Sequence, residues 1–342
     1  MKSTKNYTVQ SFTGIDERKV TGGFGSAVSM NNIRITSGKK LAVRSAIIRK
    51  MPDVNEKIIL IWSGKVNNYD SVIVVTTGSV YAYKEEYDAY ILLYSVNTAS
   101  AQAFLFGDIL YILTGNKYLA FNGIAVGQVT GYVPLIAVST PPTGGGTIYE
   151  GINLLTSQRR QLFSPDGSAS DFYLAEQNID SIVYVKNGGL NIASQYYACD
   201  LATGIVHFTM PPASGTNTLE ICYTAGENNR TLIDECTGGC TYGSGSDTRV
   251  FLFGNPDHPE RRFHSELANG QPSAAYFTST GYTEIPGHRI TSIVRHYDRQ
   301  LIFTATAAFY STDELREDGN GKYYHSYPVY SLNSEKGHIA DT

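Results

Sequence analysis

Histidines and carboxylates gather in the last third of the 342-residue sequence, and they are the first side chains to consider for chemistry. Four histidines fall within about 40 residues of each other, close to Arg262 and Glu266: His258, His264, His288 and His296. A glycosidase built on a β-propeller would place two carboxylates in the central mouth, and Glu266 with Asp298 or Asp313 can be nominated. The alternative is that the aspartates form turns and the histidines lie on the surface, and we favour it.

The thiols and one acidic turn suggest metals only superficially. Cys236 and Cys240 precede His258 and His264 by about twenty residues, so a zinc site can be imagined, but zinc ribbons show two close pairs at short spacing. Reduced thiols borne on loops are therefore favoured, and four cysteines in a chain of this length make no disulfide framework. The segment 166–168 resembles a calcium loop but lacks alternating acidic residues and a terminal Glu.

Other catalytic signatures are missing from the sequence. It has no nucleophile elbow of the Gly-x-Ser-x-Gly type and no phosphate-binding Gly-x-x-x-x-Gly-Lys-Ser/Thr loop. We therefore predict no catalytic residue, no cofactor-binding residue, no metal ligand and no cofactor.

Composition and charge narrow the class of protein. The net charge is −4 with the charges well mixed, which argues against an electrostatic nucleic-acid binder. No run of eighteen apolar residues occurs, and the first residues have no apolar signal region, so we expect no membrane segment and synthesis in the cytoplasm without a signal peptide. The 33 glycines and 25 tyrosines, without a long 3.6-residue apolar period, favour an all-β fold.

A repeated hairpin organises the chain. Residues 101–123 read as three short strands separated by Gly and Asn turns, which tolerate the positive φ of tight hairpins. Residues 72–83 align without a gap on residues 110–121, at an offset of 38, and residues 301–312 repeat the pattern more loosely. Hairpins recurring about every 40 residues are typical of β-propeller blades.

Two Gly-rich segments divide this pattern. Residues 141–146 read as a linker, and the short strands beyond them, with turns every eight to twelve residues, predict a small β-sandwich. Residues 237–246 read as a second joint, after which residues 249–254 resemble residues 103–107. We therefore predict a propeller-like body in two parts, 1–146 and 236–342, with a sandwich inserted at 147–235. At about 40 residues per blade the body would have about five to six blades, and whether this chain alone closes it stays open.

The residues after the insert resemble a widespread set of structural proteins of tailed bacteriophages and prophages. The resemblance rests on a strand ending in Gly254-Asn255-Pro256, on the strand that begins with Ile290 and Thr291, and on the hairpin at 301–312. The opening, residues 12–16 with 31–34 and 41–44, is similar to the same family, although Ser45-Ala46 stands where such openings usually have Pro-Gly.

The resemblance implies a virion protein without enzymatic activity, a tail or neck component of the nozzle kind in the phage particle. Implied partners are other tail and neck proteins and further copies of the chain in a ring, with no sequence-specific nucleic-acid binding although DNA could pass through the channel. The alternative from another class is a propeller that binds or cleaves carbohydrate. A soluble scaffold of a bacterial cell is a third reading.

Overall fold

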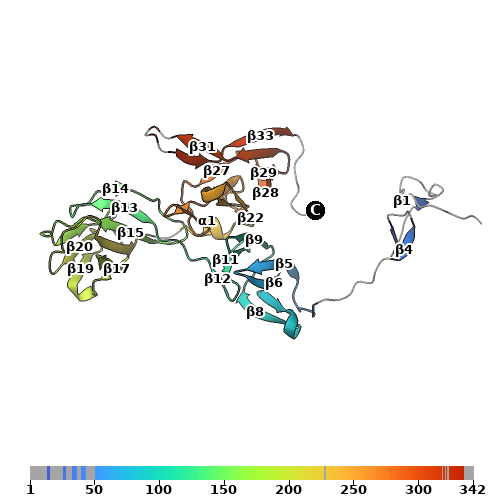
Figure 1. Ribbon diagram of the computed structural model, residues 1–342, viewed down its shortest axis with the longest axis horizontal. Coiled ribbons are helices and arrows are strands. Elements are labelled where there is room, and N and C mark those ends of the chain that lie inside the picture. Colours follow the sequence, from blue (N-terminus) through green and yellow to red (C-terminus); the bar gives the residue numbers. More distant parts are fainter. Residues whose placement is uncertain are drawn as a thin grey trace, which may run out of the picture. The chain divides into compact units, whose positions relative to one another are not determined.

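The computed structural model describes residues 14–15, 26–27, 33–36, 40–43, 51–226, 229–317, 319, 321 and 323–334 (Figure 1). The chain divides into two units, Met1–Pro52 and Asp53–Thr342. In the first unit, β1 (Gly14–Ile15) pairs in parallel with β2 (Ser26–Ala27), and β3 (Ile33–Ile35) pairs antiparallel with β4 (Leu41–Val43). No helix among the described residues is long and apolar enough to cross a membrane.

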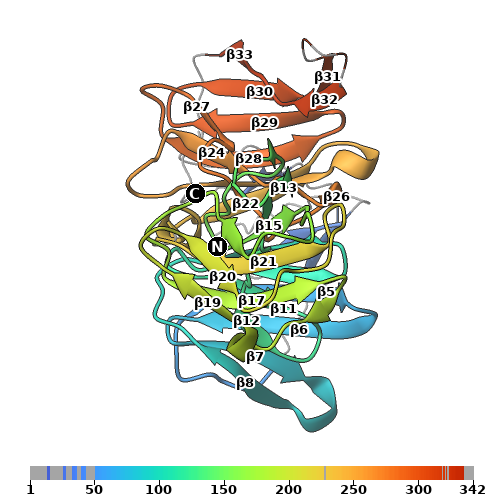
Figure 2. The same ribbon diagram turned by 90° about the vertical axis from the view of Figure 1, so that its left-hand side faces the viewer.

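The described residues of the second unit are mostly β and form, among other elements, four antiparallel sheets of four strands each. We number the sheets in chain order; Figure 2 shows them coloured from blue to red. Sheet 1 is β5 (Ile58–Val66), β6 (Tyr69–Thr76), β7 (Ser79–Lys84) and β8 (Ala89–Ser95), and sheet 2 is β9 (Gln102–Phe106), β10 (Ile109–Leu113), β11 (Tyr118–Phe121) and β12 (Val126–Gln128). Sheet 3 is β22 (Gly238–Tyr242), β23 (Arg249–Phe253), β24 (Arg261–His264) and β27 (Tyr282–Glu284), and sheet 4 is β28 (Ile290–His296), β29 (Arg299–Thr304), β30 (Ala308–Thr312) and β33 (Val329–Ser334).

The repeated hairpins are confirmed as β6–β7, β10–β11 and β29–β30, and one threonine closes each turn. The hydroxyls of Thr76, Thr114 and Thr304 are buried. Each accepts a hydrogen bond from the backbone N–H three residues later, at 3.0 Å, and donates to the carbonyl of that same residue, at 3.1 Å. The repeat in the sequence therefore has a local cause, because a threonine at this position satisfies both backbone groups of the turn.

This turn gives a first prediction. Thr304→Val keeps the shape of the side chain but removes both hydrogen bonds from a buried site, so we expect unfolding to become easier by about 1 to 3 kcal/mol. Thr304→Ser retains the hydroxyl and is the matched control, with a smaller expected loss. Urea unfolding followed by tyrosine fluorescence measures both variants; an equal loss in the two would mean that the methyl group, not the hydroxyl, stabilises the turn.

The four sheets pack in chain order, each upon the next. One core lies between sheets 1 and 2, with Ile73 and Leu110 among its residues; a second lies between sheets 2 and 3, and a third between sheets 3 and 4. Residues on β23 alternate between two of these cores, with Leu252 facing sheet 2 and Phe253 facing sheet 4. This explains why the strands are apolar throughout: sheets 2 and 3 are covered on both faces. The first strands also meet in succession, β5 with β9, β9 with β22, and β22 with β28.

The segment between sheets 2 and 3 forms two further sheets over a core of their own. Its six-stranded sheet runs β14 (Thr147–Ile148), β13 (Leu135–Thr140), β15 (Gln158–Phe163), β21 (Leu219–Thr224), β17 (Ser181–Asn187) and β18 (Leu190–Asn191). The three-stranded sheet runs β16 (Asp171–Tyr173), β20 (Ile205–Phe208) and β19 (Tyr197–Asp200). Phe163 of the six-stranded sheet makes a T-shaped ring contact with Phe172 of the three-stranded sheet at 5.5 Å, and Phe172 makes another with Phe208 of its own sheet at 5.4 Å.

Three details differ from the sequence predictions. Residues 141–146 are not a linker but the loop of the β13–β14 hairpin, so this sheet already begins at Leu135. Residues 238–242 are not part of a joint but the strand β22, where a Cβ on Gly238 would stand 2.2 Å from the ring of Phe253. In both places Gly-rich composition reflects a turn or close packing rather than a free chain. The sequence predicts five to six blades, and the described residues form four sheets of four strands.

Short elements complete the structure. They are the 3-10 helices η1 (Glu85–Tyr87), η2 (Ser194–Tyr196) and η3 (Gly245–Asp247), the helix α1 (Thr231–Asp234), and the hairpins β25 (Leu267–Ala268) with β26 (Gln271–Pro272) and β31 (Glu314–Glu317) with β32 (Tyr323–Ser326).

Candidate functional site

A network of charged side chains lies at the end of sheet 3, centred on Arg249. Arg249 is buried on β23 and binds Asp247 of η3 through Nε and through Nη2, the latter 3.0 Å from Oδ2. Its Nη1 donates to Oε2 of Glu266 at 2.6 Å and to the carbonyl of Ser265 at 2.9 Å. The hydroxyl of Tyr327 donates to the carbonyl of Asp247 at 2.8 Å. One cation therefore binds two carboxylates from different elements.

The electrostatics keep this network ionised. Burial favours the neutral form of Asp247, but the hydrogen bonds and charge of Arg249 outweigh it and lower the pKa of that carboxyl. Burial also favours the neutral form of Glu266. The effects of His264, and then of Arg249, outweigh burial and lower the pKa of that carboxyl. Burial opposes the charge of Arg249 as well, yet its two carboxylate partners raise the pKa of the guanidinium. A general acid needs a raised carboxyl pKa, and Glu266 has the opposite shift.

A cavity of about 420 Å³ opens beside this network. It is lined by Arg249, His264, Glu266, Thr283, Tyr324, His325, Ser326, Tyr327 and Pro328. Nε2 of His264 lies 3.5 Å from Oε1 of Glu266. Nδ1 of His325 lies 2.6 Å from Oδ1 of Asp313, whose Oδ2 accepts a hydrogen bond from Ser244 at 2.7 Å. His264 of this cavity is thus paired with Glu266, and His325 with Asp313 beside the cavity.

The carboxylates nominated from the sequence occupy different settings. Glu266 is bound by Arg249, and Asp313 is bound by His325 and Ser244. Asp298 lies exposed in the β28–β29 turn, where its backbone carbonyl accepts a hydrogen bond from Tyr242 at 2.6 Å. Glu266 and Asp313 therefore have structural partners through their side chains, and Asp298 has one through its backbone.

The imagined metal sites are not assembled. His258 lies in the turn after β23, His288 in the loop before β28, and His296 at the end of β28. Within the described ranges no group of three or more His, Cys, Asp or Glu side chains could hold a metal ion. The four cysteines are free. Burial raises the pKa of Cys240 to about 11 and that of Cys236 further, so both remain thiols at neutral pH.

The expected turn at Asp166 is confirmed. Its Oδ1 accepts hydrogen bonds from the backbone N–H groups of Ser168 and Ala169, both at 2.8 Å. These bonds, that from Ala169 first, lower the pKa of the carboxyl. Asp166 therefore serves a turn closed by its own side chain.

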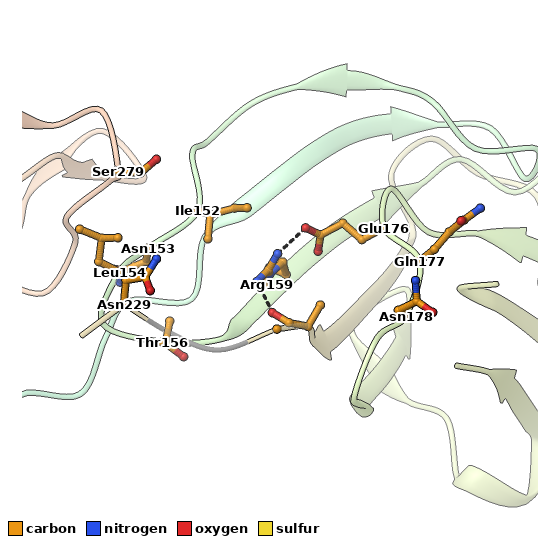
Figure 3. A pocket seen from close by; sticks show the side chains of 12 residues that line it. Ile152, Asn153, Leu154, Thr156, Arg159, Glu176, Gln177, Asn178, Asn229 and Ser279 are labelled. Atoms are coloured by element: carbon orange, nitrogen blue, oxygen red, sulfur yellow. Dashed lines mark hydrogen bonds and ion pairs between the residues drawn. The ribbon is translucent and has the colours of Figure 1, made fainter. Parts of the chain in front are cut away.

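A second cavity, of about 410 Å³, lies where the segment between sheets 2 and 3 begins and ends (Figure 3). Its lining residues are Ile152, Asn153, Leu154, Thr156, Arg159, Glu176, Gln177, Asn178, Ala225, Gly226, Asn229 and Ser279. Arg159 is buried and binds both Glu176 and the carbonyl of Ala225, as the dashed lines of Figure 3 show. These lining residues include no aromatic ring on which a sugar could stack.

Sequence reasoning missed the network around Arg249 and a second buried arginine. Asp247 ends η3 and Arg249 begins β23, so an acidic and a basic residue stand two positions apart at a junction between elements. That spacing was a usable signal for their ion pair. Arg262 is fully buried, with its guanidinium over the ring of Phe251 at 4.8 Å, and nothing near it in sequence indicates this.

Comparison with known proteins identifies no family. No family model matches the chain, and no curated protein matches it. Among solved structures, one similar chain is the extracellular domain of a one-component system from B. thetaiotaomicron, at 9% identity and a TM-score of 0.28. The match covers 89% of this chain and 38% of that chain, so this chain spans well under half the length of its counterpart.

Proposed function

We propose that this protein is a non-enzymatic structural component of a tailed phage or prophage particle, with a propeller-like body and an inserted β-sandwich. The observation that carries the proposal is the series of four antiparallel four-stranded sheets whose first strands contact one another in order. Blades of a propeller are such sheets, packed face to face with their first strands around the axis. A body of this kind resists force because its strands are bonded within each sheet and its cores lie between sheets.

The insertion is supported by where the chain leaves and re-enters the body. Asp234 of α1, just after the segment, accepts hydrogen bonds from the backbone N–H of Tyr118 at 3.2 Å and from Gln128 at 2.7 Å, both on sheet 2. Arg230 binds Asp234 at 3.0 Å and the carbonyl of Val129 at 2.8 Å. The end of the segment is therefore tied to sheet 2, from which the segment departs, and this arrangement leaves its other surfaces available to partners.

The residues that carry the phage resemblance have structural roles. Asn255 is buried in the turn after β23, and its Nδ2 donates to the carbonyl of Leu232 in α1 at 3.1 Å. Its Oδ1 accepts hydrogen bonds from the N–H groups of Asp257 at 2.9 Å and His258 at 3.1 Å. Gly254 before it has φ +79°, which favours glycine. Such a motif specifies a turn rather than a reaction, which fits a shape-giving protein.

Labelling of intact particles tests the proposal. An antibody against the purified chain, applied to phage particles from the source culture, should decorate the tail or neck in electron micrographs, in the region of DNA exit. Particles without label, together with retention of a glycan by the purified chain on a glycan array, would instead support the carbohydrate-binding alternative. If a glycan were cleaved, Glu266→Gln and Asp298→Asn would show whether the nominated carboxylates take part.

A further inference from the structure

The series of sheets ends in two faces that the described cores leave uncovered. Sheets 2 and 3 have a core on each face, whereas sheets 1 and 4 each have a core on one face in the part of the chain that the structure describes. We call the opposite face of sheet 1 the leading face and the opposite face of sheet 4 the trailing face. Strand register identifies their residues, because directly paired residues lie on the same side of a sheet.

The leading face is apolar, and it is exposed on the outer strands β5 and β8, whereas Val74 on β6 is fully buried. One row crosses all four strands of sheet 1: Ile61, Val74, Tyr81 and Leu92. None of these residues belongs to the core between sheets 1 and 2, which takes the neighbouring rows. Ile61 is 51% exposed and Leu92 is 55% exposed, although both stand in the middle of strands. Large aliphatic side chains in such positions normally lie against another layer.

The trailing face has the same character. Its row across sheet 4 is Val294, Leu301, Tyr310 and Tyr330. The residues of the next row, Ile293, Ile302 and Phe309, pack toward sheet 3. Val294 is 42% exposed and Tyr330 is 40% exposed, and the rings of Tyr310 and Tyr330 lie 5.3 Å apart. In the described part of the chain, both faces thus carry exposed apolar side chains at the two ends of one series of sheets.

Charges at matching ends of the two faces are complementary. A hollow of about 350 Å³ at one end of sheet 1 is lined by Asp70, Glu85 and Glu86, with Lys84 as its one basic residue. On the trailing face Arg299 lies over the ring of Tyr310 at 4.8 Å. The remaining charged groups near these ends are Lys65 and Asp88 on sheet 1 and Arg295, His296 and Asp298 on sheet 4, together with Glu314, which accepts hydrogen bonds from Thr312 and Tyr330 and pairs with Arg316. The hollow on sheet 1 is therefore acidic on balance, and the matching end of the trailing face presents the guanidinium of Arg299.

The two charged ends also correspond in position. In each sheet the first and second strands are joined by a two-residue turn, Asn67–Asn68 in sheet 1 and Tyr297–Asp298 in sheet 4. Asp70 lies just after the first of these turns, and Arg299 just after the second. Sheet 4 of one copy could pack on sheet 1 of another copy in the way that the internal sheets pack on one another. Arg299 would then reach the acidic hollow.

We infer that a second copy of this chain is the partner of these faces: the trailing face of one copy packs on the leading face of the next, with Arg299 in the hollow lined by Asp70, Glu85 and Glu86. The inference rests on the proposed function, because it names the surfaces through which the particle component assembles. Within one chain, the sheets already pack face to face at three interfaces, and the proposed contact between copies repeats that packing. A contact between two different faces runs head to tail and produces a closed ring when its rotation closes.

Two single variants and their mixture test the inference. Leu92→Asp places a charge on the leading face and Val294→Asp places one on the trailing face, both at exposed positions where folding should be retained. We expect the unaltered chain to form oligomers at about 100 µM in sedimentation velocity, and each variant alone to be monomeric. An equimolar mixture of the two should form a pair, because each variant still has one intact face. Ile148→Asp, at an exposed residue of β14 outside both faces, is the control and should assemble normally.

A charge exchange checks the register. Arg299→Glu should weaken assembly at least about tenfold, and combining it with Glu85→Arg and Glu86→Arg should restore it. Thermal unfolding of each variant confirms that it is folded. A monomeric unaltered chain, oligomers that survive both face variants, or a mixture that does not pair would each overturn the inference. Label on the tail of particles would still stand in those cases, so failure of this contact is distinguishable from failure of the proposed function.

Discussion

Arg262→Ala is expected to lower the free energy of unfolding by about 3 to 5 kcal/mol, since it removes the largest fully buried side chain of the described residues. Arg262 stands on β24 of sheet 3 and reaches across to sheet 4. Its Nη1 donates to Gln300 on β29, and its Nη2 donates to the carbonyl of Tyr327 at 2.7 Å. Truncation leaves both acceptors buried without that donor and opens a cavity over Phe251.

A buried arginine without a carboxylate partner raises the question of what its charge costs. Burial lowers the pKa of Arg262 to about 10, so the guanidinium is still protonated at neutral pH. Arg262→Met answers the question because it fills most of the space but makes no hydrogen bond. We expect a loss of about 2 kcal/mol, smaller than that of the alanine variant by the contribution of the cavity. Urea unfolding measures the stability of both variants. A methionine variant as stable as the unaltered chain would mean that the free-energy cost of burying the charge equals the stabilisation from the hydrogen bonds of Arg262.

The local part of this fold was predictable because its causes lie close together in the sequence. The hairpins at 72–83, 110–121 and 301–312 follow from apolar strands around a turn closed by one threonine, and that threonine is visible in the sequence. Strands that are apolar on both faces lie in sheet 2, which is covered on both sides, and also in sheet 1, where one described core covers a single face. The turn at Asp166 was likewise readable, because an aspartate that bonds the N–H groups two and three residues later needs no distant partner.

What the sequence did not reveal depends on distant residues. The parallel pairing of β13 with β15 makes residues 135–140 part of the six-stranded sheet, although a Pro- and Gly-rich segment separates them from the rest of that sheet in the sequence. Arg262 and Gln300 are 38 residues apart, and no periodic pattern relates them. The candidate site was missed for the same reason: Glu266 was noticed for its carboxylate, but its role is set by Arg249 seventeen residues earlier.

Arg249→Met should be the most pH-dependent of the destabilising changes. At neutral pH we expect a loss of about 3 to 5 kcal/mol, because Asp247 and Glu266 would remain partly or wholly buried without the cation between them. Arg316→Met is the matched control, since Arg316 pairs with Glu314 on an exposed hairpin and should change stability little. Urea unfolding at a series of pH values measures all three chains.

The sign of the pH dependence follows from the two carboxyls. In the unaltered chain their pKa values are lowered on folding, so the stability they contribute is present above their unfolded pKa of about 4 and is lost as pH falls through the folded values. Burial raises the pKa of both carboxyls. Without Arg249, the groups that still lower the pKa are Tyr327 and His325 at Asp247 and His264 at Glu266. Both carboxyls of the variant therefore bind protons at higher pH than those of the unaltered chain. The folded variant then takes up protons before the folded unaltered chain does, and the stability difference between them should shrink as pH falls toward about 4. A difference that stays constant over this range would show that Arg249 stabilises the fold through packing and its bond to Ser265 rather than through its charge.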